Sequence, residues 1–211
     1  MYVIGLTGNI ATGKSSVAAM LGSLGACVID ADKLAHWVMR AGTEANRLIV
    51  ERFGPQVRRE DGEIDRPVLA EIVFSDDKAL QDLERIVHPL VVEETLQRLK
   101  TCRRPGAVVE AVKLFEAQMH LYCDAVWVVT CTREQQIERL VRTRHLSVEQ
   151  AALRIAAQPP VQAKLAQAHV VIDNSRELEE TWRQVLRAWN EIPGAPKVPE
   201  DLPWVKPKGE A

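Results

Sequence analysis

An eight-residue loop near the amino terminus constrains this chain more than any other feature. Residues 8–15 read GNIATGKS and match G-x-x-x-x-G-K-[ST], the pattern of a phosphate-binding P-loop. Gly8 and Gly13 let the chain curl so that successive backbone N–H groups point at phosphate oxygens. Lys14 can then reach the terminal phosphates, and the Ser15 hydroxyl can ligate a bridging magnesium ion. The predicted phosphate site comprises Gly8, Asn9, Ile10, Ala11, Thr12, Gly13, Lys14, Ser15 and Ser16.

The residues on either side of the loop supply the structural context that a P-loop needs. The apolar run 2–6 predicts a buried strand, and the spacing of Val17, Met20, Leu21 and Leu24 predicts one face of a helix. The start of that helix adds a partial positive charge to the anion site. A chance match, expected in about one chain of this length in a hundred from average composition, is the alternative. We therefore predict a nucleoside triphosphate site.

Composition argues against several other classes of protein. The net charge of −2 over 211 residues offers no basic field for nucleic acid or for an anionic membrane. The four cysteines have no C-x-x-C pair and no histidine at metal-ligand spacing, so we interpret them as reduced thiols. No signal-peptide-like leader and no apolar run of membrane-spanning length occurs, and we expect a cytoplasmic protein with no membrane partner.

Later segments alternate between apolar runs and helical patterns, which predicts an α/β fold. Four further strands are predicted, at 26–30, 107–112, 125–129 and 170–172. A helical insertion without a strand of its own is expected over about 34–104, and a lid over about 139–167. Two capping boxes, Thr132 with Gln135 and Ser147 with Gln150, mark helix starts. We expect one domain over 1–192 and a disordered proline-rich tail over 193–211.

Two acidic residues follow the second predicted strand. The carboxyl ends of parallel strands meet at the ligand-binding edge of an open sheet, so Asp30 and Asp32 are expected near the γ-phosphate. One would contact magnesium through water and the other would act as a base. The alternative is that one of them caps the helix that begins near Lys33. Ser15 and Asp30 are the predicted magnesium ligands.

Basic residues and a histidine complete the set of candidates. A cluster of arginines, Arg139, Arg142 and Arg144, could stabilise the charge of phosphoryl transfer or could form a solvated face. His88 precedes Pro89, and the pair is expected to separate two helices, with Ser75 capping the first of them. The segment 113–116, KLFE, follows the third strand at the same edge of the sheet.

With these motifs in place, the chain resembles the dephospho-CoA kinase family over nearly all of residues 2–190. The resemblance is carried by GLTGNIATGKSS at 5–16, VIDADKLAH at 28–36, FG at 53–54, DGEIDRPVLAEIVF at 61–74, LERIVHP at 83–89, LFE at 114–116, QIERLV at 136–141, RIAAQ at 154–158 and VIDN at 171–174. It implies a P-loop kinase three-layer sandwich with a five-stranded parallel sheet of order 2-3-1-4-5. It also implies a helical insertion that binds dephospho-CoA, and a lid.

The resemblance further implies an activity, which is ATP-dependent phosphorylation of the ribose 3′-hydroxyl of dephospho-CoA with Mg²⁺. Residues matching the family's catalytic positions are Asp32, Lys14 and Arg139. Arg142 and Asn174 join the P-loop as expected ATP contacts, and the expected substrate contacts are Asp32, His88, Lys113, Leu114, Phe115 and Glu116. The chain departs from the family pattern at Val112 and Lys113, where proline and leucine are usual, and at Thr143, where arginine is usual. The identity of the lid arginine therefore stays open among Arg139, Arg142 and Arg144.

The sequence leaves two alternative functions open. One is another nucleoside or nucleotide kinase on the same scaffold. The other is a P-loop GTPase-like switch, which is disfavoured because the chain has no N-K-x-D run for guanine and no D-x-x-G run. Oligomeric state is left open by the sequence.

Overall fold

The computed structural model describes residues 1–205 and divides into two compact units. The first unit contains Met1–Ile29 together with the chain from Cys102 onward, and the second contains Asp30–Thr101. The second unit starts four residues earlier than the predicted insertion of 34–104, and its end, Thr101, lies three residues before the predicted end. It is an insertion between the second and third strands.

The first unit is built on a five-stranded sheet of order β2-β3-β1-β4-β5. The strands are β1 (Tyr2–Thr7), β2 (Cys27–Asp30), β3 (Gly106–Glu110), β4 (Ala125–Thr130) and β5 (Val170–Asp173). β1 pairs in parallel with both β3 and β4, and β4 pairs in parallel with β5. The apolar runs of β1, β3 and β4 are buried, as expected of central parallel strands. The predicted fold class and strand order are confirmed.

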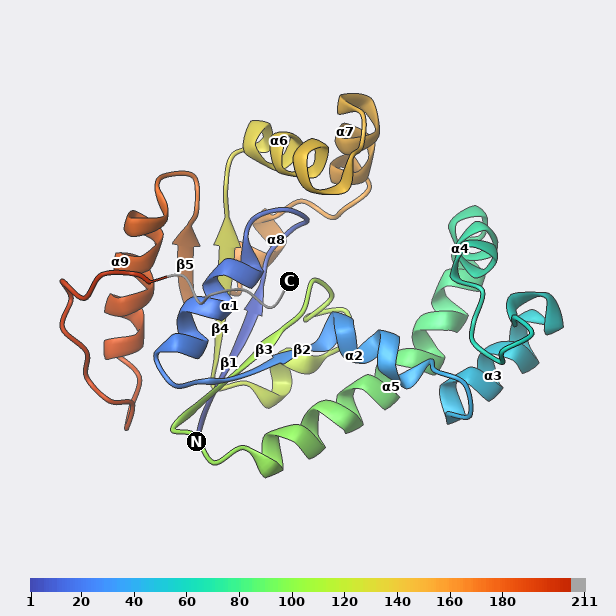
Figure 1. Ribbon diagram of the computed structural model, residues 1–211, viewed down its shortest axis with the longest axis horizontal. Coiled ribbons are helices and arrows are strands. Elements are labelled where there is room, and N and C mark those ends of the chain that lie inside the picture. Colours follow the sequence, from blue (N-terminus) through green and yellow to red (C-terminus); the bar gives the residue numbers. More distant parts are fainter. Residues whose placement is uncertain (206–211) are drawn as a thin grey trace. The chain divides into compact units, whose positions relative to one another are not determined.

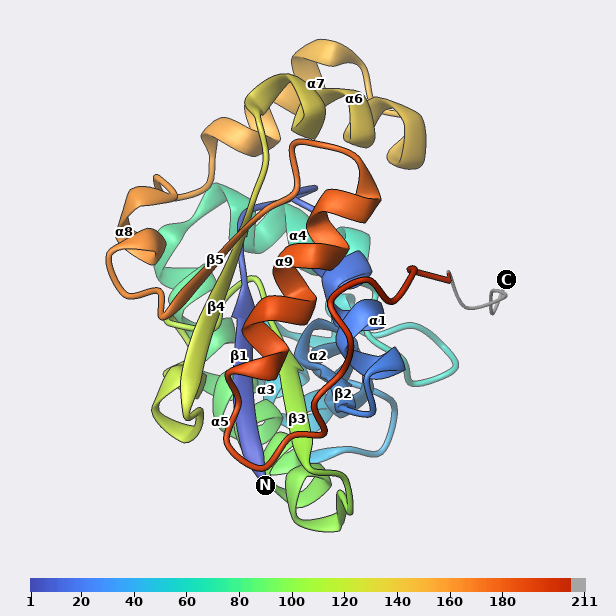
Figure 2. The same cartoon turned by 90° about the vertical axis from the view of Figure 1, so that its left-hand side faces the viewer.

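Helices α1 (Lys14–Ser23) and α9 (Leu178–Asn190) cover one face of this sheet (Figures 1 and 2). Their apolar stripes form one core with strand residues, which include Val17, Met20 and Leu21 of α1, Val185, Leu186 and Trp189 of α9, and Ile4, Leu6 and Trp127 of the sheet. The remaining elements of the unit are η2 (Met119–Tyr122), α6 (Arg133–Arg144), α7 (Val148–Ala156) and α8 (Gln162–Leu165). Both predicted capping boxes are present, at the starts of α6 and α7.

The strand register places the P-loop between two strand ends. Leu6 is paired with Glu110 of β3, and Thr7 is paired with Val128 of β4. The loop that follows Thr7 therefore leaves the sheet at the edge where β3 and β4 also end. Helices α6 and α7 lie beyond the arrowheads of the strands at this edge (Figures 1 and 2).

The second unit consists of helices α2 (Ala31–Val38), α3 (Glu44–Phe53), α4 (Arg66–Ser75) and α5 (Asp77–Thr101), with the short turn η1 (Pro55–Val57). α2, α3 and α4 all pack against α5. Asp65 caps α4 through its side chain, which accepts a hydrogen bond from the backbone N–H of Val68 at 3.2 Å. Within residues 1–205 no helix, including the 25-residue α5, is long and apolar enough to cross a membrane.

Two sequence predictions in this unit are wrong. Pro89 lies inside α5, which continues unbroken past it, so His88 and Pro89 do not separate two helices. Proline removes one N–H from the helix, but Val87, Val91 and other buried residues of α5 hold both sides of Pro89 against the neighbouring helices. Ser75 does not cap α5 either, because its hydroxyl donates back to Glu71 and Ile72 carbonyls in the last turn of α4.

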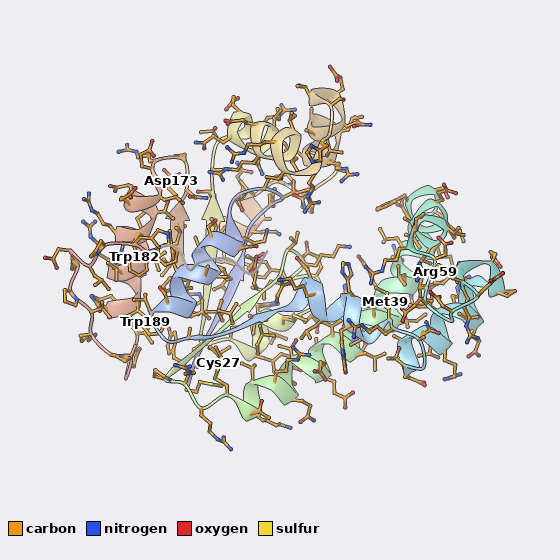
Figure 3. All side chains as sticks on the ribbon, viewed as in Figure 1. Cys27, Met39, Arg59, Asp173, Trp182 and Trp189 are labelled. Carbon is orange, nitrogen blue, oxygen red and sulfur yellow. A yellow bond between two sulfur atoms is a disulfide. The ribbon has the colours of Figure 1, made fainter. Side chains whose placement is uncertain are left out.

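Cys27 and Cys102 form a disulfide, so the prediction of four reduced thiols is wrong for this pair. Cys27 begins β2 (Figure 3), and Cys102 directly follows α5, with a sequence separation of 75 residues. The chain leaves and re-enters the first unit close to these two residues. Cys123 and Cys131 are free thiols. Burial raises the pKa of Cys123 to about 12, which keeps that thiol protonated at neutral pH.

Described residues of the proline-rich tail, within 193–205, contact α9, although the sequence predicted a disordered tail. The Trp204 ring lies 5.1 Å from the ring of Trp182 (Figure 3), a residue of α9, and the Trp182 indole N–H donates to the Leu202 carbonyl at 2.5 Å. Asn190 exchanges two hydrogen bonds with the backbone of Val198. Prolines cannot donate backbone hydrogen bonds, but carbonyl groups between them accept bonds from side chains of α9. The predicted tail residues 206–211 lie outside the described residues.

We expect Trp204→Ala to lower the free energy of unfolding by about 1–2 kcal/mol, because an aromatic pair and its buried area are lost. Thermal and urea unfolding of the full chain would measure the change. Val205→Ala is the matched control, since Val205 is the adjacent residue and is 75% exposed. Equal stability of Trp204→Ala and the unchanged protein would show that the tail does not stabilise the first unit.

Candidate active site

The P-loop has the glycines that its curvature demands. Gly8 and Gly13 have φ values of 153° and 97°, in a region that side chains rarely adopt. A Cβ at Gly8 would overlap the Val129 carbonyl oxygen, and one at Gly13 would overlap the Asn174 amide nitrogen. The two glycines of the motif are therefore required by backbone conformation and by close packing against the ends of β4 and β5.

Arg139 and Asn174 hold the outer side of the loop. One guanidinium nitrogen of Arg139 donates to the carbonyls of Ala11 and Thr12, at 3.2 and 3.0 Å. The Asn174 side-chain amide donates to the same Thr12 carbonyl at 2.8 Å, and Arg139 also donates to the Asn174 carbonyl at 2.9 Å. These carbonyls are bound on one side of the loop, while the Thr12 N–H closes a turn within it by donating to the Asn9 carbonyl at 3.4 Å. This arrangement orients the loop as an anion-binding nest.

Asn174 is only 2% exposed, and both ends of its side-chain amide are hydrogen-bonded to protein groups. Its side-chain oxygen accepts a hydrogen bond from the Thr181 hydroxyl of α9 at 2.9 Å, while its amide nitrogen holds Thr12. Asn174 therefore links the P-loop to the core of the first unit. A contact with the nucleotide, which the resemblance implied, stays a prediction.

Arg139→Ala is expected to reduce kcat/KM for ATP by about 10², as when a group that orders the reacting site is removed. Arg139→Lys should restore little of the loss, because an ammonium group cannot span three carbonyl oxygens as the planar guanidinium does. Steady-state kinetics at varied ATP would measure both variants. Arg133→Ala, an exposed arginine on the same helix, is the control. Full activity of Arg139→Lys would contradict the positioning role.

Lys14, Ser15 and Glu110 form the polar interior of the site. Lys14 is 7% exposed, and its ammonium group donates to the Asn9 carbonyl at 3.2 Å. The Ser15 hydroxyl donates to a Glu110 carboxylate oxygen at 2.8 Å. That donation directs the hydroxyl proton at Glu110 and leaves the lone pairs of the Ser15 oxygen for a cation. Hydroxyl and carboxylate oxygens are the hard ligands that Mg²⁺ prefers, so this donor set fits magnesium.

Sequence reasoning did not single out Glu110. It is 6% exposed and is the last residue of β3, in register with Leu6 just before the P-loop. A signal was present, because an acidic residue ending an apolar run points to the ligand-binding edge of a parallel sheet. Within residues 1–205 there is no group of three or more His, Cys, Asp and Glu side chains placed to hold a metal ion by themselves.

The second unit carries the two predicted aspartates. The Asp30 carboxylate accepts a hydrogen bond from the Lys33 backbone N–H at 2.9 Å and forms an ion pair with the Lys33 ammonium at 3.2 Å. Asp30 is therefore the N-cap of α2, which is the alternative role considered for it; a role in binding magnesium stays a prediction. Asp32 lies in the first turn of α2 and is exposed.

One turn after Asp32 on the same helix lies His36. Partial burial and the nearby Arg66 lower the pKa of His36, against the attraction of Asp32 and Asp30. At neutral pH the imidazole is therefore uncharged, and it adds no positive charge beside the two carboxylates.

The remaining predicted residues lie in different surroundings. Phe115 packs its ring 4.9 Å from the His120 ring, whereas Leu114 is fully buried and belongs to the core of the first unit. Lys113 and Glu116 are exposed in the same segment.

The other predicted contacts lie on helices. His88 lies in α5 of the second unit. Arg142 and Arg144 are exposed on α6, and Ser16 is exposed on the first turn of α1. Their predicted contacts with substrates stay predictions.

The first unit thus combines a strand–P-loop–helix segment with a lysine, a serine and an acidic side chain at the carboxyl edge of a sheet of order 2-3-1-4-5. Helix α6 follows β4, and its Arg139 side chain donates a hydrogen bond to the loop. This fold and this site define the class of P-loop kinases.

Comparisons with known proteins identify the family within that class. The family model described as dephospho-CoA kinase matches residues 2–180. The dephospho-CoA kinase of Moorella thermoacetica is 42% identical over 212 residues, which cover 97% of this chain and 100% of that protein. The dephospho-CoA kinase of Geobacter sulfurreducens is 44% identical over 192 residues, covering 90% and 98% of the two chains. A solved dephospho-CoA kinase from Campylobacter jejuni is 27% identical, with a TM-score of 0.65 over 90% of this chain and 96% of that one. The chain belongs to the dephospho-CoA kinase family.

Proposed function

We propose that this protein transfers the γ-phosphoryl group of ATP to the ribose 3′-hydroxyl of dephospho-CoA, giving coenzyme A and ADP. The observation that carries the proposal is the similarity to dephospho-CoA kinases over nearly the whole length of the chain and of those relatives. The P-loop supports it independently, because its glycines, its bound outer carbonyls and Lys14 suit a nucleoside triphosphate.

In the proposed reaction the P-loop positions the phosphates and spreads their charge. Inward-facing N–H groups bind the β-phosphate, and the Lys14 ammonium reaches toward the β- and γ-phosphates. Ser15 and Glu110 would hold Mg²⁺, with Asp30 as a further predicted contact. When bound, that ion would offset negative charge on the phosphates of ATP. Most of the catalytic effect then comes from positioning and charge stabilisation.

Asp32 is proposed as the general base. A ribose hydroxyl is a poor nucleophile, so a carboxylate is needed to orient it and to accept its proton. The bond from the 3′-oxygen to the γ-phosphorus forms while the bond from that phosphorus to the β,γ-bridging oxygen breaks. The hydroxyl proton passes to Asp32, and the electron pair of the broken bond leaves with ADP. The position of Asp32 within the D-A-D segment that the family shares supports this role.

The substrates and the compartment follow from the same reaction. ATP and dephospho-CoA are the proposed ligands, with His88 and the segment 113–116 as the proposed contacts for dephospho-CoA. Because ATP is the donor, we propose the cytoplasm as the place of action.

A panel of acceptors and donors tests the proposal. Purified protein with Mg²⁺ would be given ATP or GTP together with dephospho-CoA, adenosine or AMP, and nucleoside diphosphate release would be followed. Rapid release only with ATP and dephospho-CoA is the expected result. Faster turnover with adenosine or AMP would indicate another nucleoside or nucleotide kinase, and tight GTP binding without an acceptor would indicate a GTPase-like protein.

A further inference from the structure

The segment that follows α7 contacts the first half of the P-loop. The side-chain oxygen of Gln158 accepts a hydrogen bond from the backbone N–H of Ile10 at 2.6 Å. The adjacent Pro159 carbonyl accepts a hydrogen bond from the side-chain amide of Asn9 at 3.2 Å. Asn9 is buried, and Gln158 and Ile10 are half-buried, so both hydrogen bonds are partly shielded from solvent. Two neighbouring residues of the lid are thus joined to two neighbouring residues of the loop.

Both backbone polar groups of Ile10 are hydrogen-bonded by the part of the chain that contains α6 and α7. The Ile10 carbonyl accepts a hydrogen bond from the Gln136 side-chain amide at 2.6 Å, and Gln136 lies in the first turn of α6. The Ile10 N–H is bound by Gln158, which follows the end of α7. Helices α6 and α7 also pack against each other. Movement of α6, α7 and the segment after them as one body would therefore act on Ile10 at both of its backbone polar groups.

The contact with Gln158 differs in kind from those made by Arg139 and Asn174. Those two side chains donate to loop carbonyls. Gln158 instead binds an N–H, so the Ile10 amide is directed at the lid. A neutral amide oxygen is suited to this position, because a carboxylate there would add a negative charge beside a loop that binds a triphosphate.

We propose that Gln158 is a positioning residue for ATP, which couples the lid to the P-loop through the Ile10 N–H. When the lid is closed, Gln158 fixes the first half of the loop, and the second half is then held ready for the phosphates. The proposal rests on the proposed function only in that the ligand is ATP. Gln158 acts through Ile10 and has no assigned contact with the reacting atoms.

The test compares Gln158→Ala and Gln158→Glu with Gln167→Ala. Gln167 is an exposed glutamine nearby in the sequence, whose side chain donates to Ala163 within its own segment. Three quantities would be measured on the full chain: hydrogen exchange of the Ile10 amide by NMR without ligand, the Kd for ATP by calorimetry, and kcat with dephospho-CoA. The first does not depend on activity, and the first two do not depend on the acceptor.

In Gln158→Ala the Ile10 amide should exchange about tenfold faster and ATP should bind about tenfold more weakly, as expected when a hydrogen bond of ordinary strength is lost. Gln158→Glu keeps an acceptor for Ile10, so protection of the amide should persist while the added charge still weakens ATP binding. Gln167→Ala should change none of the three quantities.

Unchanged Ile10 exchange in Gln158→Ala would overturn the proposal, and so would ATP affinity within twofold of the unchanged protein. Loss of Ile10 protection in Gln158→Glu with unchanged affinity for ATP would also overturn it, because the contact and the affinity would then be independent. If the unchanged protein failed to phosphorylate dephospho-CoA but Gln158→Ala still showed faster Ile10 exchange and weaker ATP binding, the proposed function would fail and this inference would stand. A melting curve for each variant checks that the fold is retained.

Discussion

Replacing both Cys27 and Cys102 by serine is expected to lower the free energy of unfolding by about 4.5 kcal/mol, from the loss of loop-closure constraint in the unfolded chain. The size follows from the length of chain between the two residues, whose sequence separation is 75. The closed loop includes the whole second unit, Asp30–Thr101. Without the disulfide, the unfolded chain gains the freedom to separate these two points, while the folded contacts of β2 and β3 remain.

Denaturant unfolding of the oxidised protein, the reduced protein and the Cys27→Ser/Cys102→Ser variant would measure this change. The reduced protein and the variant should unfold at the same, lower denaturant concentration. The control is Cys123→Ser/Cys131→Ser, because these cysteines are free thiols and their removal leaves the disulfide intact. If oxidised and reduced proteins unfolded together, the disulfide would contribute nothing to stability.

The second large effect is expected at Asp32, where Asp32→Asn should lower kcat by about 10²–10⁴, the usual weight of general-base catalysis. Asparagine keeps the size of the side chain and most of its hydrogen bonds, but it cannot accept a proton at neutral pH. The affinity for ATP should hardly change, because the P-loop supplies that binding. Single-turnover kinetics with ATP and dephospho-CoA, together with calorimetry for ATP, would measure both quantities.

Asp30→Asn is the comparison variant for this prediction. Asparagine caps helices about as well as aspartate, so α2 should keep its first turn and the protein its stability. A smaller loss of turnover than in Asp32→Asn is expected. If Asp32→Asn were active and Asp30→Asn inactive, the roles assigned to the two carboxylates would be reversed.

The parts of the fold that depend on local pattern could be predicted from the sequence. The strand bounds agree within one or two residues, and both capping boxes occur where Thr132 and Ser147 indicated. Apolar runs and capping residues act within a few positions of each other along the chain. The strand order came from the resemblance and is confirmed.

Three of the predictions that failed depended on contacts between distant parts of the chain. The spacing of Cys27 and Cys102 in the sequence does not show that β2 and the chain after α5 meet. Tertiary packing keeps α5 continuous through Pro89, against the local preference of proline. Trp204 has no periodic apolar neighbours, and only the structure shows Trp182 as its partner.

The candidate site also has a part that could be predicted from the sequence and a part that could not. The P-loop motif identified the phosphate site from residue types alone. Residue types alone could not predict the roles of Glu110, Gln136 and Gln158. Each contacts the loop although it lies about 95 residues or more away in the sequence. Arg139 was singled out for its charge, whereas its geometry shows a guanidinium that binds three backbone carbonyls.

The most direct test of the proposed activity is ³¹P NMR and mass spectrometry of the product formed from ATP, Mg²⁺ and dephospho-CoA. We expect dephospho-CoA to gain one phosphoryl group, with a new phosphomonoester signal coupled to the ribose 3′ proton and an equal amount of ADP. ADP formed without phosphorylated dephospho-CoA, or an ester on a different hydroxyl group, would contradict the assignment of this chain as a dephospho-CoA 3′-kinase.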